Sequence, residues 1–376
     1  MPRLIAQRTG QRVQVKGRQI DFSFWPSRPG RRHRGLQSLL FALDPWAIIR
    51  QTVERECLPQ SRRVEALATL EQAEDFFVMG TERGTEAAQP LALYYSYMNL
   101  SKTFCLTRGP RATFDQAQHG LKERLNGQKR ELIDATLIAD LTTRDRAQNF
   151  AELLTTLTGA PLAARKTYDL PALLPQILPG HRLWAHATRK VERFIAIDDL
   201  QFWQDTTDRS LWLRIYLLAE DLSRLGVSHQ RMLSESGLAG KFREVQSDIP
   251  GKICLEQKIP QPCPDNYPAD DLHHVVAAVR PFLWMTVTSI PPYRRYYIYL
   301  CPINEVAHRL PQLLSIYAMT FYLGSITRYR PHHFDALLRG TFGPRVRDFV
   351  TGQPLQFLYL MASEIAQRDV TKPSIL

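Results

Sequence analysis

Apolar residues recur at three- and four-residue steps along much of the chain, a spacing that predicts helices with a buried face. Asp44 and Pro45 begin the first of these stretches, because Asp can cap a helix and Pro fits its first position. Pro331 ends a later one. Helices are therefore expected at residues 45–56, 61–79, 90–108, 127–141, 146–159, 310–330 and 355–369.

The stretch that begins at Pro90 is the most apolar of these helices. Its Leu, Tyr, Met and Phe residues fall on more than one face and leave a thin polar stripe of Ser96, Asn99 and Thr103. A helix with this pattern is expected to be central and covered on most sides. A Gly-Pro break follows, and the next segment ends in His119-Gly120-Leu121.

A different pattern follows three prolines in nine residues, Pro171 to Pro179. Short runs rich in β-branched and aromatic residues are bounded by Gly, Pro, Asp or Ser, which is typical of strands. These runs are residues 193–199, 210–218, 241–247, 251–259, 282–287 and 294–303, interrupted by a helical AEDLSRLG segment. The chain is therefore predicted to be α+β and mainly α, with a largely antiparallel β-rich middle and C-terminal helices that pack back on the first helices.

The predicted division has four parts. Residues 1–40 form a basic N-terminal arm, residues 41–170 a helical domain, residues 171–305 the β-rich segment, and residues 306–376 the helices that complete the helical core. Within the arm, alternating apolar residues on either side of Lys16-Gly17 predict a β-hairpin with a two-residue turn.

The net charge of +11 is concentrated in this arm, since residues 1–34 hold nine Lys or Arg and one acid. A basic arm can bind nucleic-acid phosphates. The candidate nucleic-acid-binding residues are Arg28, Arg31, Arg32 and Arg34. The alternative for this segment is a solvated loop.

The sequence predicts neither a metal ion nor another cofactor. The five cysteines lack metal-ligand spacing, and their odd number in a long chain fits buried, reduced thiols. Asp248 and Glu256-Gln257-Lys258 imitate a metal-dependent nuclease, but such triplets are common by chance among 37 acidic residues, and a solvated strand face explains them. No apolar run could cross a bilayer, and the N-terminus is too polar for a signal peptide, so a cytoplasmic protein is expected.

Five segments carry a resemblance to the bacterial YaaC-like family: LEQAEDFF at 70–77, LYYSYMNLSKTFCL at 93–106, HGL at 119–121, YDLPALLPQI at 168–177 and GSITRYRP at 324–331. The helix and its His-Gly segment also resemble the HEPN helical domain of bacterial toxins, antitoxins and phage-defence proteins. The resemblance implies a HEPN-like bundle and a metal-independent ribonuclease, in which an Arg pairs with a His four to six residues later across a dimer.

Arg328 and His333 match that spacing and are the candidate catalytic pair. A His can take the proton of an RNA 2′-hydroxyl or donate a proton to the leaving oxygen, and an Arg can hold the phosphate. The alternative is structural, because Arg328 shares a helical stripe with Phe321 and Gly324 and suits a buried Arg bound to a carboxylate or to helix C-terminal carbonyls.

The secondary candidates are His119, Lys102 and Arg108, expected around one helix end. A structural hydrogen-bonding role for His119 is the alternative to acid–base chemistry.

Three classes of function stay open. The first is a ribonuclease effector in antiphage defence or a toxin-like system, acting as a dimer. The second is a non-catalytic adaptor that acts with an operon-encoded partner, through the helical block or through an aromatic sheet face of Phe282, Trp284, Tyr296, Tyr297 and Tyr299. The third is a module that binds RNA or DNA through the basic arm.

Overall fold

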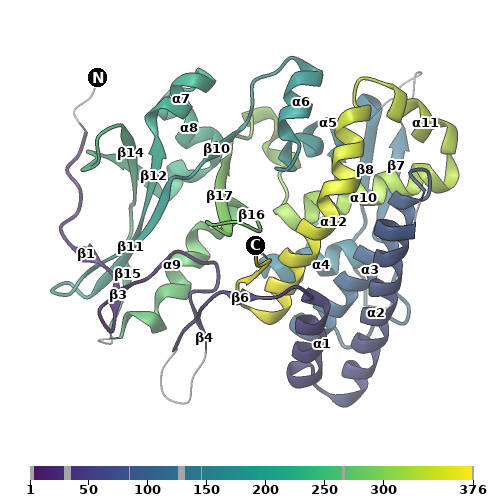
Figure 1. Ribbon diagram of the computed structural model, residues 1–376, viewed down its shortest axis with the longest axis horizontal. Helices are drawn as coiled ribbons and strands as arrows, with labels where there is room; N and C mark the ends of the chain where they lie inside the picture. Colours follow the sequence, from purple (N-terminus) through teal and green to yellow (C-terminus); the bar gives the residue numbers. More distant parts are fainter. Residues whose placement is uncertain are drawn as a thin grey trace. The chain divides into compact units, whose positions relative to one another are not determined.

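The structure is a computed structural model that describes residues 4–28, 35–83, 85–125, 132–144, 146–264 and 267–374 (Figure 1). Its internal contacts divide the chain into two compact units. The helical unit comprises Ala42–Lys190 and Asn304–Ala366, and the sheet unit comprises Met1–Phe41, Val191–Ile303 and Gln367–Leu376. The fold is α+β and mainly α, with its strands in small separate sheets, as the sequence predicts.

The helical unit is built around helix α3, Gln89–Arg108, which packs against helices from both ends of the unit's sequence. The longer helices around it are α1 (Pro45–Glu56), α2 (Gln60–Val78), α4 (Asn149–Thr158), α10 (Gln312–Tyr329) and α12 (Gly343–Ala366). Shorter helices are α5 (Leu170–Leu173), α6 (His181–Thr188) and α11 (Pro331–Arg339). Helices α2, α10 and α12 all contact α3, although more than 200 residues of sequence separate α2 from α10 and α12.

The central position predicted for α3 is confirmed, and its polar stripe is buried as well. Ser96, Asn99 and Thr103 are each at most 3% exposed. Ser96 donates to the Ala73 carbonyl of α2 at 2.8 Å, and the Thr103 and Thr69 hydroxyls are 3.0 Å apart. The stripe therefore joins α3 to α2, because buried hydroxyls need hydrogen-bond partners.

One helix prediction is wrong. Residues 127–141 were expected to be helical, yet Ala135–Ala139 is strand β8, which pairs with β7 (Leu121–Leu125) and β9 (Lys166–Asp169) in an antiparallel sheet of the helical unit. Burial alternates along β8, with Ala135, Leu137 and Ala139 inside. This two-residue period is that of a strand, and the apolar content alone could not distinguish it from a short helix.

The sheet unit holds a six-stranded antiparallel sheet in the order β1-β11-β12-β14-β13, with β15 also paired to β12. Its strands are β1 (Gln11–Arg12), β11 (Asp199–Asp205), β12 (Ser210–Leu218), β13 (Phe242–Val245), β14 (Lys252–Gln257) and β15 (Gln261–Pro262). A second sheet joins β10 (Phe194–Ala196), β17 (Arg294–Tyr299) and β16 (Leu283–Val287), and the unit's helices are α7 (Ala219–Leu225), α8 (His229–Ser236) and α9 (Leu272–Val279).

The N-terminal segment forms part of this unit through strand pairing and buried side chains. Strand β1 pairs with β11, and β2 (Gln14–Val15) and β3 (Arg18–Gln19) form a hairpin around Lys16-Gly17. Further short pairs join β4 (Ser27–Arg28) to β5 (Gly35–Leu36), and β6 (Leu40–Phe41) to β18 (Val370–Thr371). Val13, Val15 and Ile20 are buried. Within the described residues, no helix has the length and apolar character needed to cross a membrane.

Candidate functional site

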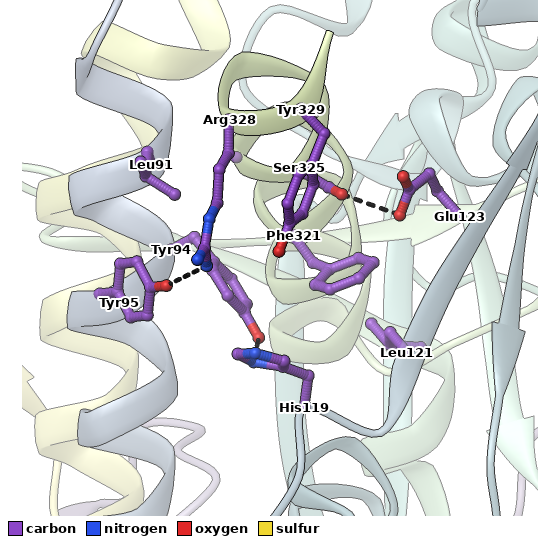
Figure 2. A pocket seen from close by; sticks show the side chains of 11 residues that line it. Leu91, Tyr94, Tyr95, His119, Leu121, Glu123, Phe321, Ser325, Arg328 and Tyr329 are labelled. Atoms are coloured by element: carbon purple, nitrogen blue, oxygen red, sulfur yellow. Dashed lines mark hydrogen bonds between the residues drawn. The ribbon is translucent and has the colours of Figure 1, made fainter.

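A cavity of about 140 Å³ opens on the helical unit between α3, α10 and the segment that leads into β7 (Figure 2). Aromatic rings form much of its wall: Tyr94, Tyr95, Phe321 and Tyr329. Four polar side chains also line it: His119, Glu123, Ser325 and Arg328. It thus brings together an imidazole, a carboxylate, a guanidinium and hydroxyl groups from three parts of the chain.

Arg328 lies exposed in the last turn of α10, where a cation interacts favourably with the helix dipole. Its Nη1 donates to the Tyr95 hydroxyl at 2.8 Å (Figure 2). The Tyr95 ring in turn stacks on Phe76. The guanidinium also lies 4.9 Å from the centre of the Tyr329 ring. Arg328 is therefore held at the pocket by aromatic side chains and is available to an anion. The alternative of a buried structural Arg at this position is wrong.

His119 lies at the hydroxyl end of Tyr94, and its Nδ1 is 2.6 Å from the Tyr94 hydroxyl (Figure 2). Gly120, which follows, has a φ of 80°, and a side chain there would meet the backbone nitrogen of Phe150. The backbone at Gly120 thus turns the chain from His119 into β7.

Partial burial lowers the pKa of His119, and the positive charges of Lys102 and Arg328 lower it further. The residue as a whole is nevertheless exposed. The imidazole is consequently neutral at neutral pH, since its ordinary pKa is about 6.5. A neutral imidazole beside a guanidinium can donate or accept one proton next to a bound anion.

The carboxylate of Glu123 forms the other wall of the pocket. It accepts from the Ser325 hydroxyl at 2.8 Å (Figure 2). It also accepts from Arg330 Nη1 at 3.2 Å. Both of these partners come from the end of α10, so Glu123 fixes β7 against that helix.

A family model for YaaC-like proteins matches residues 25–365, nearly the whole chain. The chain belongs to the YaaC-like family. Neither a curated protein nor a solved structure matches it. The match confirms the YaaC-like resemblance carried by the five sequence segments, whereas the HEPN-like character of the helical core stays a prediction.

In this YaaC-like chain, Arg328 shares its pocket with His119, while His333 lies outside the residues that line it. His333 is in the first turn of α11, where its backbone N–H donates to the Arg330 carbonyl and its ring packs against His332. Pro331 begins α11 and turns the chain between Arg328 and His333.

The sequence predicts that Lys102 and Arg108 lie with His119 at one helix end, but the structure does not bring the three residues together there. Arg108 is 14 residues after Tyr94 on α3, which at about 1.5 Å per residue places it ~21 Å along the helix. Its guanidinium binds Glu56 and the Ile365 carbonyl, a structural role. Lys102 is half-buried, and its positive charge lowers the pKa of His119.

The basic arm offers one described candidate, Arg28, which is exposed at the end of β4. Arg31, Arg32 and Arg34 lie outside the described residues. By contrast, Arg8 has a structural role. Its backbone N–H donates to Glu256, and its guanidinium donates to the carbonyls of Gln257 and Lys258.

The acid-x-Lys triplet is neither a metal site nor a solvated strand face. Glu256 is 0% exposed and accepts from Arg214 at 3.1 Å and from Arg243 at 3.1 Å, while Arg214 lies over the Trp203 ring. Lys258 donates to the Ala239 carbonyl. In the part of the chain that the structure describes, no group of three His, Cys, Asp or Glu residues could hold a metal ion.

The aromatic residues of the second sheet are mainly core residues. Trp284, Tyr296 and Tyr299 are at most 9% exposed. Phe282 and Tyr297 are partly exposed, so only these two of the five aromatic residues could contact a partner. The adaptor alternative stays a prediction.

The sequence missed Tyr94, Tyr95 and Glu123 as pocket residues. Tyr94 was assigned only to an apolar face of α3, and Tyr95 was given no role. A signal was present nevertheless, because a Tyr in a buried helix usually finds a partner for its hydroxyl. Glu123 lies on strand β7, which was not predicted, and so its direction could not be inferred.

Proposed function

We propose that this YaaC-like protein is a HEPN-related component of a bacterial antiphage defence or toxin-like system, which cleaves RNA without a metal ion. The observation that carries the proposal is the pocket shared by His119 and Arg328. The proposal places the protein in the bacterial cytoplasm, where its RNA substrate is found.

The chemistry follows from the side chains at the pocket. Arg328 binds the phosphate at the cleavage position, because its planar N–H groups match phosphate oxygens. The RNA 2′-oxygen attacks the adjacent phosphorus and loses its proton, while the 5′-oxygen leaves and takes up a proton. The products are a 2′,3′-cyclic phosphate and a 5′-hydroxyl. His119 is the second catalytic residue, next to the phosphate, and the aromatic wall offers rings on which a base can stack.

The test is cleavage of a fluorescent single-stranded RNA by the purified full chain in EDTA. His119→Ala and Arg328→Ala should each lower the rate at least ~100-fold, the usual loss for a group that stabilises charge in the transition state. Arg339→Ala is the matched control, because Arg339 is 82% exposed and pairs with Asp335 at the surface. Intact RNA with the wild-type chain, or cleavage that persists in both pocket variants, would reject the proposal.

His333→Ala separates this assignment from the pair predicted by spacing. The pocket predicts unchanged cleavage by this variant, since His333 does not line it. A loss equal to that of Arg328→Ala would instead support a dimer in which His333 of one copy meets Arg328 of another. The molar mass measured alongside reports whether the chain is a homo-oligomer.

Partner and RNA binding are also part of the proposal. An operon-encoded protein that co-purifies with a chain that leaves RNA intact would favour the adaptor alternative. Exposed Arg28, together with Arg31, Arg32 and Arg34, would guide RNA by its phosphates. Their replacement by Ala should weaken RNA binding and flatten its dependence on salt.

A further inference from the structure

Three buried side chains connect the interior of the helical unit to His119. Asn149, at the start of α4, donates from Nδ2 to the Tyr317 hydroxyl of α10 at 3.1 Å. The Tyr317 ring lies edge-on to the Tyr94 ring of α3, 6.0 Å from it centre to centre, and the two hydroxyls interact. The Tyr94 hydroxyl in turn lies 2.6 Å from His119 Nδ1. Asn149, Tyr317 and Tyr94 are at most 4% exposed. These four residues form a polar relay that leads from the core to the pocket.

The direction of the hydrogen bonds in this relay is fixed at its buried end. Asn149 Nδ2 also contacts the Met98 carbonyl at 3.2 Å. A carbonyl can only accept, so the amide nitrogen must face it, and an amide nitrogen can only donate. Tyr317 therefore accepts a hydrogen bond from Asn149.

The remaining protons then have one arrangement that gives each tyrosine hydroxyl proton a strong acceptor. Within the described residues, the Tyr317 hydroxyl has Asn149 and Tyr94 as its partners. Because Asn149 cannot accept at Nδ2, the Tyr317 proton must go to Tyr94. Tyr94 has two further possible acceptors, His119 Nδ1 at 2.6 Å and Met98 Sδ at 3.7 Å. Because a thioether sulfur is a weak acceptor, Tyr94 directs its own proton to the imidazole nitrogen. The opposite direction would leave the Tyr317 proton buried without an acceptor, which is unfavourable.

We propose that Tyr94 and Tyr317 are positioning residues that hold His119 as the neutral tautomer with its proton on Nε2. This inference rests on the proposed function and assigns the role of His119 within it. Beside Arg328, the Nε2–H donates to a non-bridging oxygen of the RNA phosphate, and the 2′-hydroxyl proton passes to water. His119 is thus an oxyanion donor to a phosphodiester rather than the base.

The electrostatics of the pocket agree with this arrangement. A second proton on Nδ1 would face the proton of Tyr94. Tyr94 could then turn its proton only towards Tyr317, which already accepts from Asn149, or towards Met98 Sδ at 3.7 Å, which is a weak acceptor. The relay therefore opposes protonation in the same direction as the burial and the charges of Lys102 and Arg328, which lower the pKa of His119.

The tautomer can be measured without RNA, by ¹H–¹⁵N correlation NMR on the full chain labelled with ¹⁵N-histidine. His119→Gln identifies the signals by their loss. The expected wild-type result is a proton on Nε2 and an unprotonated Nδ1, by at least tenfold. In Tyr94→Phe this preference should collapse and the pKa of His119 should rise. A proton on Nδ1 in the wild type, or an unchanged tautomer in Tyr94→Phe, would overturn the inference.

Tyr95→Phe is the matched control. Tyr95 is the next residue on α3 and loses the same oxygen, but it binds Arg328 and not His119. Its replacement should leave the tautomer unchanged. Tyr317→Phe, which removes the group that directs the Tyr94 proton, should give a mixture of tautomers even with Tyr94 intact, so the inference does not depend on one variant.

Cleavage kinetics provide a separate readout. If His119 donates from Nε2, Tyr94→Phe should lower kcat about tenfold or more with little change in KM. If His119 were the base, Tyr94→Phe would preserve or raise kcat, because Nε2 would then be free to accept. An inactive wild-type chain with the expected tautomer would reject the ribonuclease but keep the relay. An active chain with the opposite tautomer would support the ribonuclease and reject the relay.

Discussion

The contact between α3 and α10 beneath the pocket depends on Gly324, and Gly324→Ala tests how closely the two helices pack. A Cβ atom at residue 324 would lie 3.0 Å from the Tyr94 Cβ and 3.2 Å from the Pro90 carbonyl oxygen. Both atoms belong to α3 close to its backbone, so neither can rotate away. The added methyl group can be accommodated only if the two helices separate.

Two opposing effects set the magnitude. Ala is favoured over Gly inside a helix by about 1 kcal/mol. Overpacking of a tight contact costs ~1–3 kcal/mol. Gly324→Ala should therefore lower the free energy of unfolding by about 0–2 kcal/mol.

Gly352 on α12 supplies the control, because it is exposed and a Cβ there would meet nothing within 4 Å. Gly352→Ala keeps only the helix gain and should stabilise the protein by ~0.5–1 kcal/mol. The two variants should thus differ by about 1–3 kcal/mol in urea unfolding followed by helical circular dichroism. Equal stabilities would refute the close α3–α10 contact. A measurable shift of the His119 NMR signals in Gly324→Ala alone would locate the strain at Tyr94.

Further predictions concern charge and thiols. Glu256→Ala leaves Arg214 buried without its carboxylate, so the free energy of unfolding should fall by ~3–5 kcal/mol in urea titrations, and wild-type stability would contradict this account. Because the pKa of His119 is lowered in the folded chain, the unfolded chain binds its proton first, and the stability linked to His119 should fall as pH drops below about 6.5. Lys102→Met should raise the pKa of His119 in an NMR titration and reduce that loss; an unchanged pKa would exclude the charge effect. All five cysteines are free and buried, so a thiol reagent should label them only when the protein unfolds.

The elements that could be predicted are those specified by local chemistry. Asp44 accepts hydrogen bonds from the N–H groups of Trp46 and Ala47, as its position before Pro45 indicates, and α1 begins there. The strand predicted at residues 210–218 is β12, with the same bounds, because its apolar run is flanked by polar turn residues and buried along nearly all its length. Both signals lie within about ten residues of the element that they define.

Two features that depend on distant partners were not predicted. Strand β8 is a five-residue run whose identity depends on pairing with β7 and β9, about 15 to 30 residues away. The buried Glu256 was taken for a solvated residue, because Arg214, its partner, lies on the neighbouring strand β12. In both cases the residue pattern was compatible with two environments, and only tertiary contacts select between them.

The candidate site shows the same limit most clearly, and it also shows where a local signal survives. His333 is close to Arg328 in sequence, yet His119, more than 200 residues away, shares its pocket. What joins them is the Tyr94-Tyr95 doublet. Successive residues on a helix point about 100° apart, so one turn of α3 directs the first hydroxyl to His119 and the second to Arg328. The separation of the two functional groups is therefore set by α3, and the doublet marks the site more directly than any spacing between His and Arg.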